Sequence, residues 1–268
     1  MAIEAAFNLP FEEAAEFFRK KLNIPTERWD DLWGEQHAKG FMVAGAMQAD
    51  LLNDFSKAVD QAITGGGTLE TFRKNFDGIV EKNGWEYNGG RNWRSKVIYE
   101  TNVRSAYQAG RWKQLSEPSL REVYPYLEYR HGDSLNPRAD HLRWDGTILS
   151  ADDPWWSTHY PQNGWGCKCK VFAASLRDLA RAGKTEPDKA PTAVDDMTGI
   201  DEGWGHNAGM GAERDFDILA DKAESLNDDI AFAWAYSIIE SAMAEKITSL
   251  LGADTALGEM IKTITKGG

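Results

Sequence analysis

The residues best suited to chemistry lie near the middle of the chain, where cysteines and histidines gather. Cys167 and Cys169 are the only cysteines and stand one residue apart, so a disulfide between them would close a small, strained ring. Two thiolates with the imidazoles of His141 and His159 are a sufficient ligand set for tetrahedral zinc. The spacing matches neither a C-x2-C finger nor an H-E-x-x-H zincin. These four residues are the candidate zinc ligands; the alternative is that His141 and the cysteines are hydrogen-bonded core groups.

The same region permits a catalytic interpretation. Asp140 and His141 could act as a base and its orienting partner, or His131 and His159 as an acid–base pair for RNA cleavage. A hydrolytic or nucleic-acid-modifying enzyme would use His141, Asp145 and the two cysteines, with or without zinc. No nucleophile elbow, P-loop or dinucleotide-binding glycine motif accompanies them. Because the sequence shows no complete set of catalytic residues, we favour a non-enzymatic protein and keep the enzyme as the alternative.

Charge indicates which partners the protein can have. The chain carries 30 basic and 42 acidic residues, a net charge of -12, which disfavours a protein that coats the DNA backbone. Within this acidic chain, Arg94, Arg104 and Arg111 flank one predicted helix. Such arginines most often cover a solvated helix face, and next most often bind a phosphate or an acidic partner. They are the candidate partner-binding residues.

The elements that must position these residues begin with helices. Apolar residues recur at three- and four-residue intervals over about residues 11–22, 41–62, 68–83 and 92–112, which predicts four helices that could form one bundle. Thr68 is the expected N-cap of the third. Residues 1–117 are therefore expected to form a helical N-terminal region.

The pattern changes after Pro118. Residues 123–129 predict a strand, which Pro125 would place at a sheet edge or a bulge. Residues 130–166 lack a helical period and contain four tryptophans, which should hold this long loop in place. A second strand over 168–172 and a short helix capped by Ser175 complete a core region over 118–183. A linker and helices at about 215–226, 228–251 and 255–265 fill 184–268. The expected class is α+β: a helical N-terminal half, a small sheet with a tryptophan-rich looped core, and a helical C-terminal tail.

Composition and hydropathy are those of a globular protein without a membrane partner. Of the 268 residues, 42% are hydrophobic and 27% charged. The longest nearly uncharged apolar stretch, Ile230 to Ile239, is about half of the roughly 20 residues that a membrane-spanning helix needs. Residues 1–10 show no secretory signal pattern, so we expect synthesis into the cytoplasm.

Four segments together resemble the phage Mu F-like minor head proteins, also called phage head morphogenesis proteins. They are IPTERWDDLWGEQHAKGFMVAGAMQADLL (24–52), WRSKVIYETNVRSAYQAGRW (93–112), the stretch from YRHGDSLNPRADHLRWDGTIL to WWSTHYPQNGWGCKCKV (129–171), and GIDEGWGHNAG (199–209). The third, with its His-x3-Asp-Gly and Pro-x-Asn-Gly-Trp-x-Cys-x-Cys pattern, is the most specific. His141, Asp145, Asn163, Cys167 and Cys169 match the family core.

This resemblance implies a minor head protein of a tailed phage or prophage. Members associate with the portal vertex, enter the procapsid, and affect capsid assembly and DNA packaging. The implied partners are the portal protein and other head or scaffold proteins, with packaged DNA as a further candidate. The implied location is the host cytoplasm and then the virion head. The acidic balance of this chain suits docking on protein better than coating of DNA.

Overall fold

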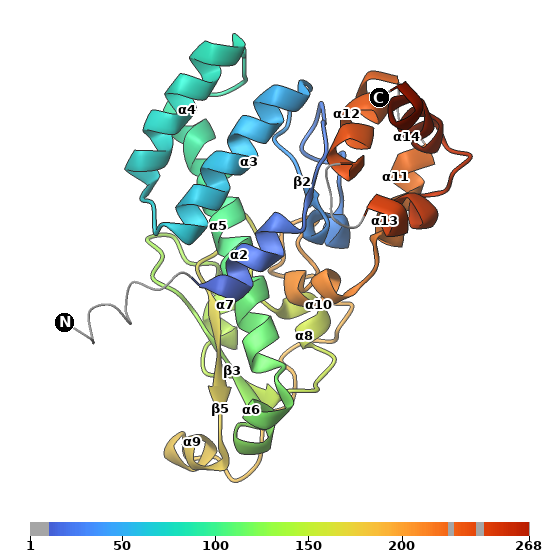
Figure 1. The fold of residues 1–268 in the computed structure, drawn as a ribbon. Coiled ribbons are helices and arrows are strands. Elements are labelled where there is room, and N and C mark those ends of the chain that lie inside the picture. The colour runs from blue at the N-terminus through green and yellow to red at the C-terminus, as the bar shows by residue number, and fades with distance from the viewer. Residues whose placement is uncertain (1–10, 225–227, 240–243, 268) are drawn as a thin grey trace, which may run out of the picture.

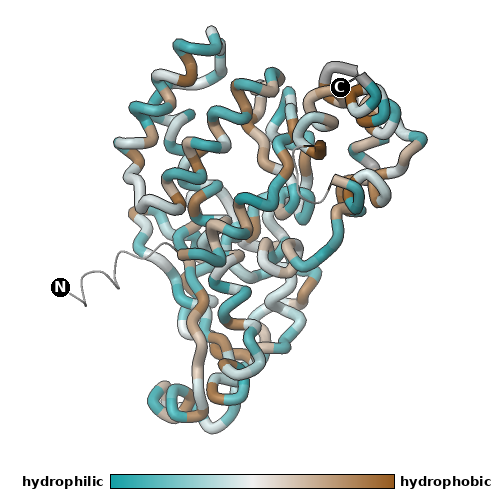
Figure 2. The backbone as a smooth tube through the Cα atoms, in the orientation of Figure 1, coloured by the Kyte–Doolittle hydropathy of each residue, from teal (hydrophilic) through white to brown (hydrophobic). Residues whose placement is uncertain are grey.

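The computed structural model describes residues 11–224, 228–239 and 244–267 (Figure 1). Its N-terminal half is helical, as predicted, with α2 (Glu12–Arg19), α3 (Ala49–Thr64), α4 (Leu69–Asn83) and α5 (Arg91–Leu115). Hydrophobic and hydrophilic residues alternate along α3 and α4 (Figure 2), and the hydrophobic ones meet in a core around Phe55, Phe72 and Phe76. Gly110 lets α5 approach α2, since a Cβ there would lie 2.6 Å from the backbone nitrogen of Ala14.

The segment between α2 and α3 differs from its prediction. The short strands β1 (Leu22–Asn23) and β2 (Gly40–Phe41) pair in parallel on either side of the 3-10 helix η1 (Gly34–Ala38). Helix α3 therefore begins at Ala49 and not near Phe41. The backbone carbonyl of Phe41 accepts a hydrogen bond from Ile24 N at 2.8 Å, and Gly45 has φ +82°. Both features are incompatible with a continuous helix.

A three-stranded antiparallel sheet forms the second layer. Strand β3 (Tyr126–Arg130) lies between β4 (Ile148–Ser150) and β5 (Lys170–Ala174). The expected edge position was wrong, because β3 is the central strand. Pro125 precedes the strand, where no N–H is needed, and its carbonyl accepts from Ala151 N at 2.9 Å. The first residue of the predicted strand, Val123, is instead the last residue of helix α6 (Pro118–Val123).

The loop between the strands is a packed core. It contains the short helices α7 (Ala139–Trp144) and α8 (Trp156–His159). Trp144, Trp155 and Trp156 are buried together with Trp112 of α5, which joins this core to the helical half. Trp165, the fourth tryptophan of the loop, is 43% exposed and lies outside this core.

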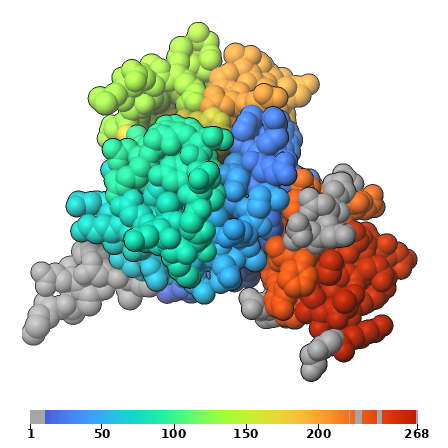
Figure 3. Space-filling model, turned by 90° about the horizontal axis from the view of Figure 1, so that it is seen from above, coloured from blue at the N-terminus to red at the C-terminus, as the bar shows by residue number. Residues whose placement is uncertain are grey.

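The C-terminal part is helical, and the fold class is α+β as predicted. Ser175 caps α9 (Leu176–Arg181), and a long connection leads to α10 (Ala208–Glu213). The later elements are η2 (Phe216–Leu219), α11 (Ala220–Glu224), α12 (Asp228–Ile239), α13 (Ala244–Leu251) and α14 (Ala256–Gly267). They share a hydrophobic core with Leu22, Ile24 and Leu32. Figure 3 shows these helices, orange to red, beside the blue N-terminal segments. Across the described ranges, no helix is both long and apolar enough to span a membrane.

Candidate metal centre and partner groove

Three of the four candidate zinc ligands meet in the buried core. His141 lies on α7, while Cys167 and Cys169 lie in the segment that enters β5. The Nδ1 atom of His141 is 3.5 Å from the Sγ atom of Cys169 and 3.8 Å from that of Cys167. The three residues are 2 to 4% exposed, and their ligand atoms all lie within 4.8 Å of one another. We call them the His/Cys cluster.

The imidazole of His141 is held in one orientation. Its Nε2 lies 2.8 Å from the carbonyl oxygen of Gly199. A carbonyl oxygen only accepts, so Nε2 carries a proton and Nδ1 is the ring nitrogen that faces the sulfurs. Gly199 has φ +86°, and a Cβ there would lie 2.6 Å from the Cβ of Asp140. Glycine therefore permits the close approach that brings this carbonyl to the ring.

The two cysteines share negative charge unequally. The hydrogen bond from the Cys169 thiol, with further donation by the backbone N–H groups of Asn163 and Cys169, lowers the pKa of Cys167 to about 4. The pKa of Cys169 is raised, because the Cys167 sulfur holds its proton and burial disfavours a second charge. A negative charge is therefore favoured on Cys167 over Cys169.

A glycine just after β3 packs closely against the segment that contains the cysteines. The backbone N–H of Gly132 donates to the sulfur of Cys169, and a Cβ on Gly132 would lie only 1.9 Å from the carbonyl oxygen of Lys168. We expect Gly132→Ala to lower the free energy of unfolding by about 1–3 kcal/mol, because the two backbones must separate. Urea denaturation measures this loss.

The matched control is Gly78→Ala in α4, where an added Cβ meets nothing within 4 Å. This change should stabilise the protein by up to about 1 kcal/mol, because alanine favours the helix. Loss of stability in Gly78→Ala, or none in Gly132→Ala, would contradict the packing assigned to these glycines.

His159, the fourth candidate ligand, lies outside the His/Cys cluster. Its ring nitrogens contact Thr158 Oγ1 at 2.8 Å, Thr192 Oγ1 at 3.0 Å and the carbonyl oxygen of Asp196 at 3.1 Å. The ring stacks on Trp155 at a centroid distance of 4.4 Å. It is therefore a hydrogen-bonded core histidine.

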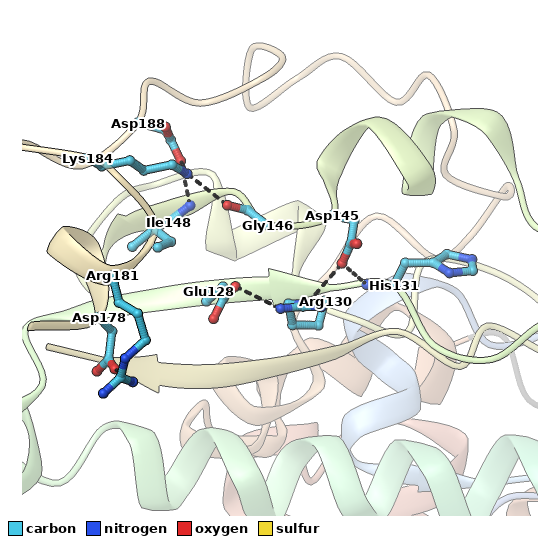
Figure 4. A network of polar contacts seen from close by, with 10 residues as sticks. All are labelled: Glu128, Arg130, His131, Asp145, Gly146, Ile148, Asp178, Arg181, Lys184 and Asp188. Carbon is cyan, nitrogen blue, oxygen red and sulfur yellow. Dashed lines mark hydrogen bonds and ion pairs between the residues drawn. The ribbon is translucent and has the colours of Figure 1, made fainter.

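Asp145 also points away from the cysteines. Its Oδ1 accepts from Arg130 Nε at 3.0 Å and from His131 N at 2.8 Å, which ties the end of β3 to the end of α7 (Figure 4). The carboxylate thus holds the turn in place. The enzyme alternative requires His141, Asp145 and the two cysteines to converge on one point, and they do not.

The three candidate arginines do not form one surface. At about 100° per residue, the ten positions from Arg94 to Arg104 rotate the side chain onto a different side of α5. Arg104 pairs with Glu100 at 3.2 Å and lines the cavity beside the cysteines, and Arg111 donates to Gln114 Oε1 at 3.1 Å. Of the three, only Arg94 lines a second groove, which is bordered by exposed tryptophans.

We did not predict this groove, which has a volume of about 1040 Å³, from the sequence. Exposed indoles border it: Trp29, Trp33, Trp93 and Trp165 are 42 to 56% exposed. Trp165 packs on Trp29 and on Trp204, which also lines the groove, at centroid distances of 6.2 and 5.1 Å. We call it the tryptophan groove. Each of the four segments that carry the family resemblance contributes at least one of these tryptophans. Their presence in all four segments is the feature of the sequence that could have indicated the groove.

Basic groups without acidic partners lie inside the groove. Burial lowers the pKa of Lys21 to about 7, that of His37 to about 3 and that of His206 to about 4. Lys21 Nζ donates to the carbonyl oxygen of His37 at 2.7 Å, and Arg94 Nη2 donates to that of Ala44. His206 Nδ1 and Arg94 Nε are buried with no hydrogen-bond partner among the described residues. Lys21 and Arg94 are therefore basic side chains of the groove that have no acidic partner among the described residues.

Comparison with known proteins supports the resemblance. The chain is 33% identical over 192 residues to the putative capsid assembly protein F of Escherichia phage Mu, covering 66% of this chain and 43% of that protein. It is 31% identical over 227 residues to the Mu-like prophage FluMu F protein of Haemophilus influenzae, covering 71% of this chain and 54% of that one. The chain thus spans about half the length of these curated relatives. No solved structure matches.

The family match includes part of the helical half and the His/Cys cluster. Residues 53–172 match the family described as Phage Mu protein F like protein, a range that runs from α3 into β5 and contains His141, Cys167 and Cys169. The predicted resemblance is confirmed, and the chain is a Mu F-like protein.

Proposed function

We propose that this protein is a minor head protein of a tailed phage or prophage, and that it associates with the portal vertex during capsid assembly and DNA packaging. Its relative in phage Mu is named a putative capsid assembly protein, and the similarity covers both halves of the α+β core. Such a role requires a surface that binds another head protein. The tryptophan groove is the observation that carries this proposal.

The tryptophan groove has the properties of a protein-docking site. Large, partly exposed aromatic side chains are concentrated at protein interfaces, where they supply much of the binding energy. Here Trp29, Trp33, Trp93 and Trp165 surround one concave surface instead of being scattered singly. An apolar segment of a partner would bury these indoles.

Charge indicates which segment fits. Lys21 and Arg94 lie in the groove without acidic partners among the described residues. A carboxylate on the docked segment would therefore supply the missing partner. DNA fits less well, because Glu27, Glu86 and Glu202 also line the groove and the chain has a net charge of -12. We therefore assign the groove to an apolar segment of the portal protein that carries an acidic side chain.

Binding to the cognate portal protein tests the proposal. The double variant Trp93→Ala/Trp165→Ala should weaken the complex by about 2 kcal/mol or more, roughly 30-fold in Kd, because each indole would be buried on docking. Biolayer interferometry with immobilised portal protein measures Kd. Incorporation of each variant into heads, scored by immunoblot of purified particles, provides a second readout.

Phe232→Ala is the matched control, since Phe232 on α12 is 46% exposed and lies outside the groove. It should bind the portal protein like the wild type. Unchanged Kd in the double variant would remove the groove from the proposal, and absence of wild-type binding together with absence from heads would overturn the function itself.

A further inference from the structure

We propose that the His/Cys cluster binds one zinc ion through His141 Nδ1 and the two cysteine sulfurs, with a water molecule as the fourth ligand. This site is separate from the tryptophan groove and does not depend on the function proposed above. It rests on donor chemistry, on the distances between the donors, and on the groups that orient them.

The distances match those between ligands of a tetrahedral ion. Zinc binds sulfur at about 2.3 Å and nitrogen at about 2.0–2.1 Å, so a sulfur and a nitrogen on one tetrahedral zinc lie about 3.5 Å apart. The observed Nδ1–Sγ distances are 3.5 Å to Cys169 and 3.8 Å to Cys167. Nδ1 thus faces both sulfur atoms at these distances, and one cation between the three atoms would be bound by all of them.

The surroundings orient the donors as in protein metal sites. A histidine that binds a metal through one ring nitrogen usually donates the other N–H to a carbonyl or carboxylate. His141 does this through Nε2 and the Gly199 carbonyl. Backbone N–H groups of Asn163 and Gly132 donate to the Cys167 and Cys169 sulfurs, respectively, which favours thiolates.

The donor set selects the metal and leaves one position open. Two thiolates and an imidazole suit zinc, whereas magnesium and calcium require oxygen ligands. Among the described residues, no further histidine, cysteine or carboxylate joins the group. The nearby Tyr129 hydroxyl donates to Asn163 Oδ1 at 3.1 Å, and burial raises its pKa, so it stays a neutral phenol. Both cysteines line a cavity of about 1110 Å³, from which water can reach the fourth position.

Such an ion would link three separate parts of the chain. It would connect α7, the segment entering β5 and, through the His141–Gly199 hydrogen bond, the connection that follows α9. These parts meet at the tryptophan-rich core. Zinc would therefore stabilise the folded loop.

Metal analysis of the full chain, purified under reducing conditions, tests the site. We expect about one zinc per chain in the wild type and at least a tenfold weaker affinity in His141→Asn and in Cys169→Ser. The matched control is His131→Ala, because His131 lines the same cavity but lies outside the cluster. It should retain zinc.

Cobalt titration of metal-free wild-type protein gives a result that needs no variant. Tetrahedral cobalt with two thiolates should produce visible ligand-field bands and a near-ultraviolet sulfur-to-cobalt charge-transfer band, saturating at one equivalent. Circular dichroism checks that the metal-free protein and each variant remain folded. Failure of folded wild-type protein to bind zinc or cobalt would overturn the proposal, as would wild-type zinc affinity in folded Cys169→Ser.

Discussion

Replacement of Trp144 by alanine is expected to lower the free energy of unfolding by about 3–5 kcal/mol. The indole is 2% exposed and packs edge-on against Tyr129 and Trp155 at centroid distances of 5.7 and 5.6 Å. It also stacks on His141 at 4.9 Å. Truncation would leave a cavity at the centre of the loop core and remove the support of the His141 ring, so the loop should lose its packing.

Urea denaturation followed by circular dichroism measures this effect. Trp165→Ala is the matched control, because the same side chain is 43% exposed there and its removal opens no buried cavity. It should cost less than about 1 kcal/mol. Similar losses in the two variants would contradict the placement of Trp144 in the core and of Trp165 at the groove.

Acidification from pH 7 to pH 5 is expected to destabilise the protein by about 2 kcal/mol for each of two groove histidines. Burial lowers the pKa of His37 to about 3 and that of His206 to about 4, from the ordinary value of 6.5. Below pH 6.5 these two histidines are therefore protonated in the unfolded chain but stay neutral in the folded chain. Stability falls with pH from that point until the folded-state pKa values are reached.

The contribution of one histidine can be isolated by substitution. His206→Gln removes one titrating group, so its stability should fall by about 2 kcal/mol less than that of the wild type between pH 7 and pH 5. Urea denaturation of both proteins at the two pH values provides the comparison. Equal losses would show that His206 is not held neutral in the groove.

The helices were predictable where their signals are local. Thr68 accepts from Thr71 N and begins α4, and Ser175 forms a capping box with Asp178 at the start of α9. These bonds span three residues, so the amino acids that make them stand beside one another in the sequence. The pairing of β1 with β2 has no such local signal, since it joins Leu22 to Gly40 and packs against the C-terminal helices.

The candidate site was predictable in part. Cys167, Cys169 and His141 share one core, in agreement with the resemblance and with the chemistry of their side chains. His159 was indistinguishable from His141 by residue type. The difference is that His159 stacks on Trp155 and bonds to Thr192 and Asp196, whereas His141 turns toward the sulfurs.

The α+β class, the helical N-terminal half and the residue types of the cluster follow from local patterns, because period, caps and composition act over a few residues. Three other features became visible only in the folded chain: β3 is the central strand, Asp145 binds Arg130, and Trp29 and Trp204 border the same groove. These contacts join residues far apart in the chain. Their geometry follows from how whole elements pack, which no local pattern encodes.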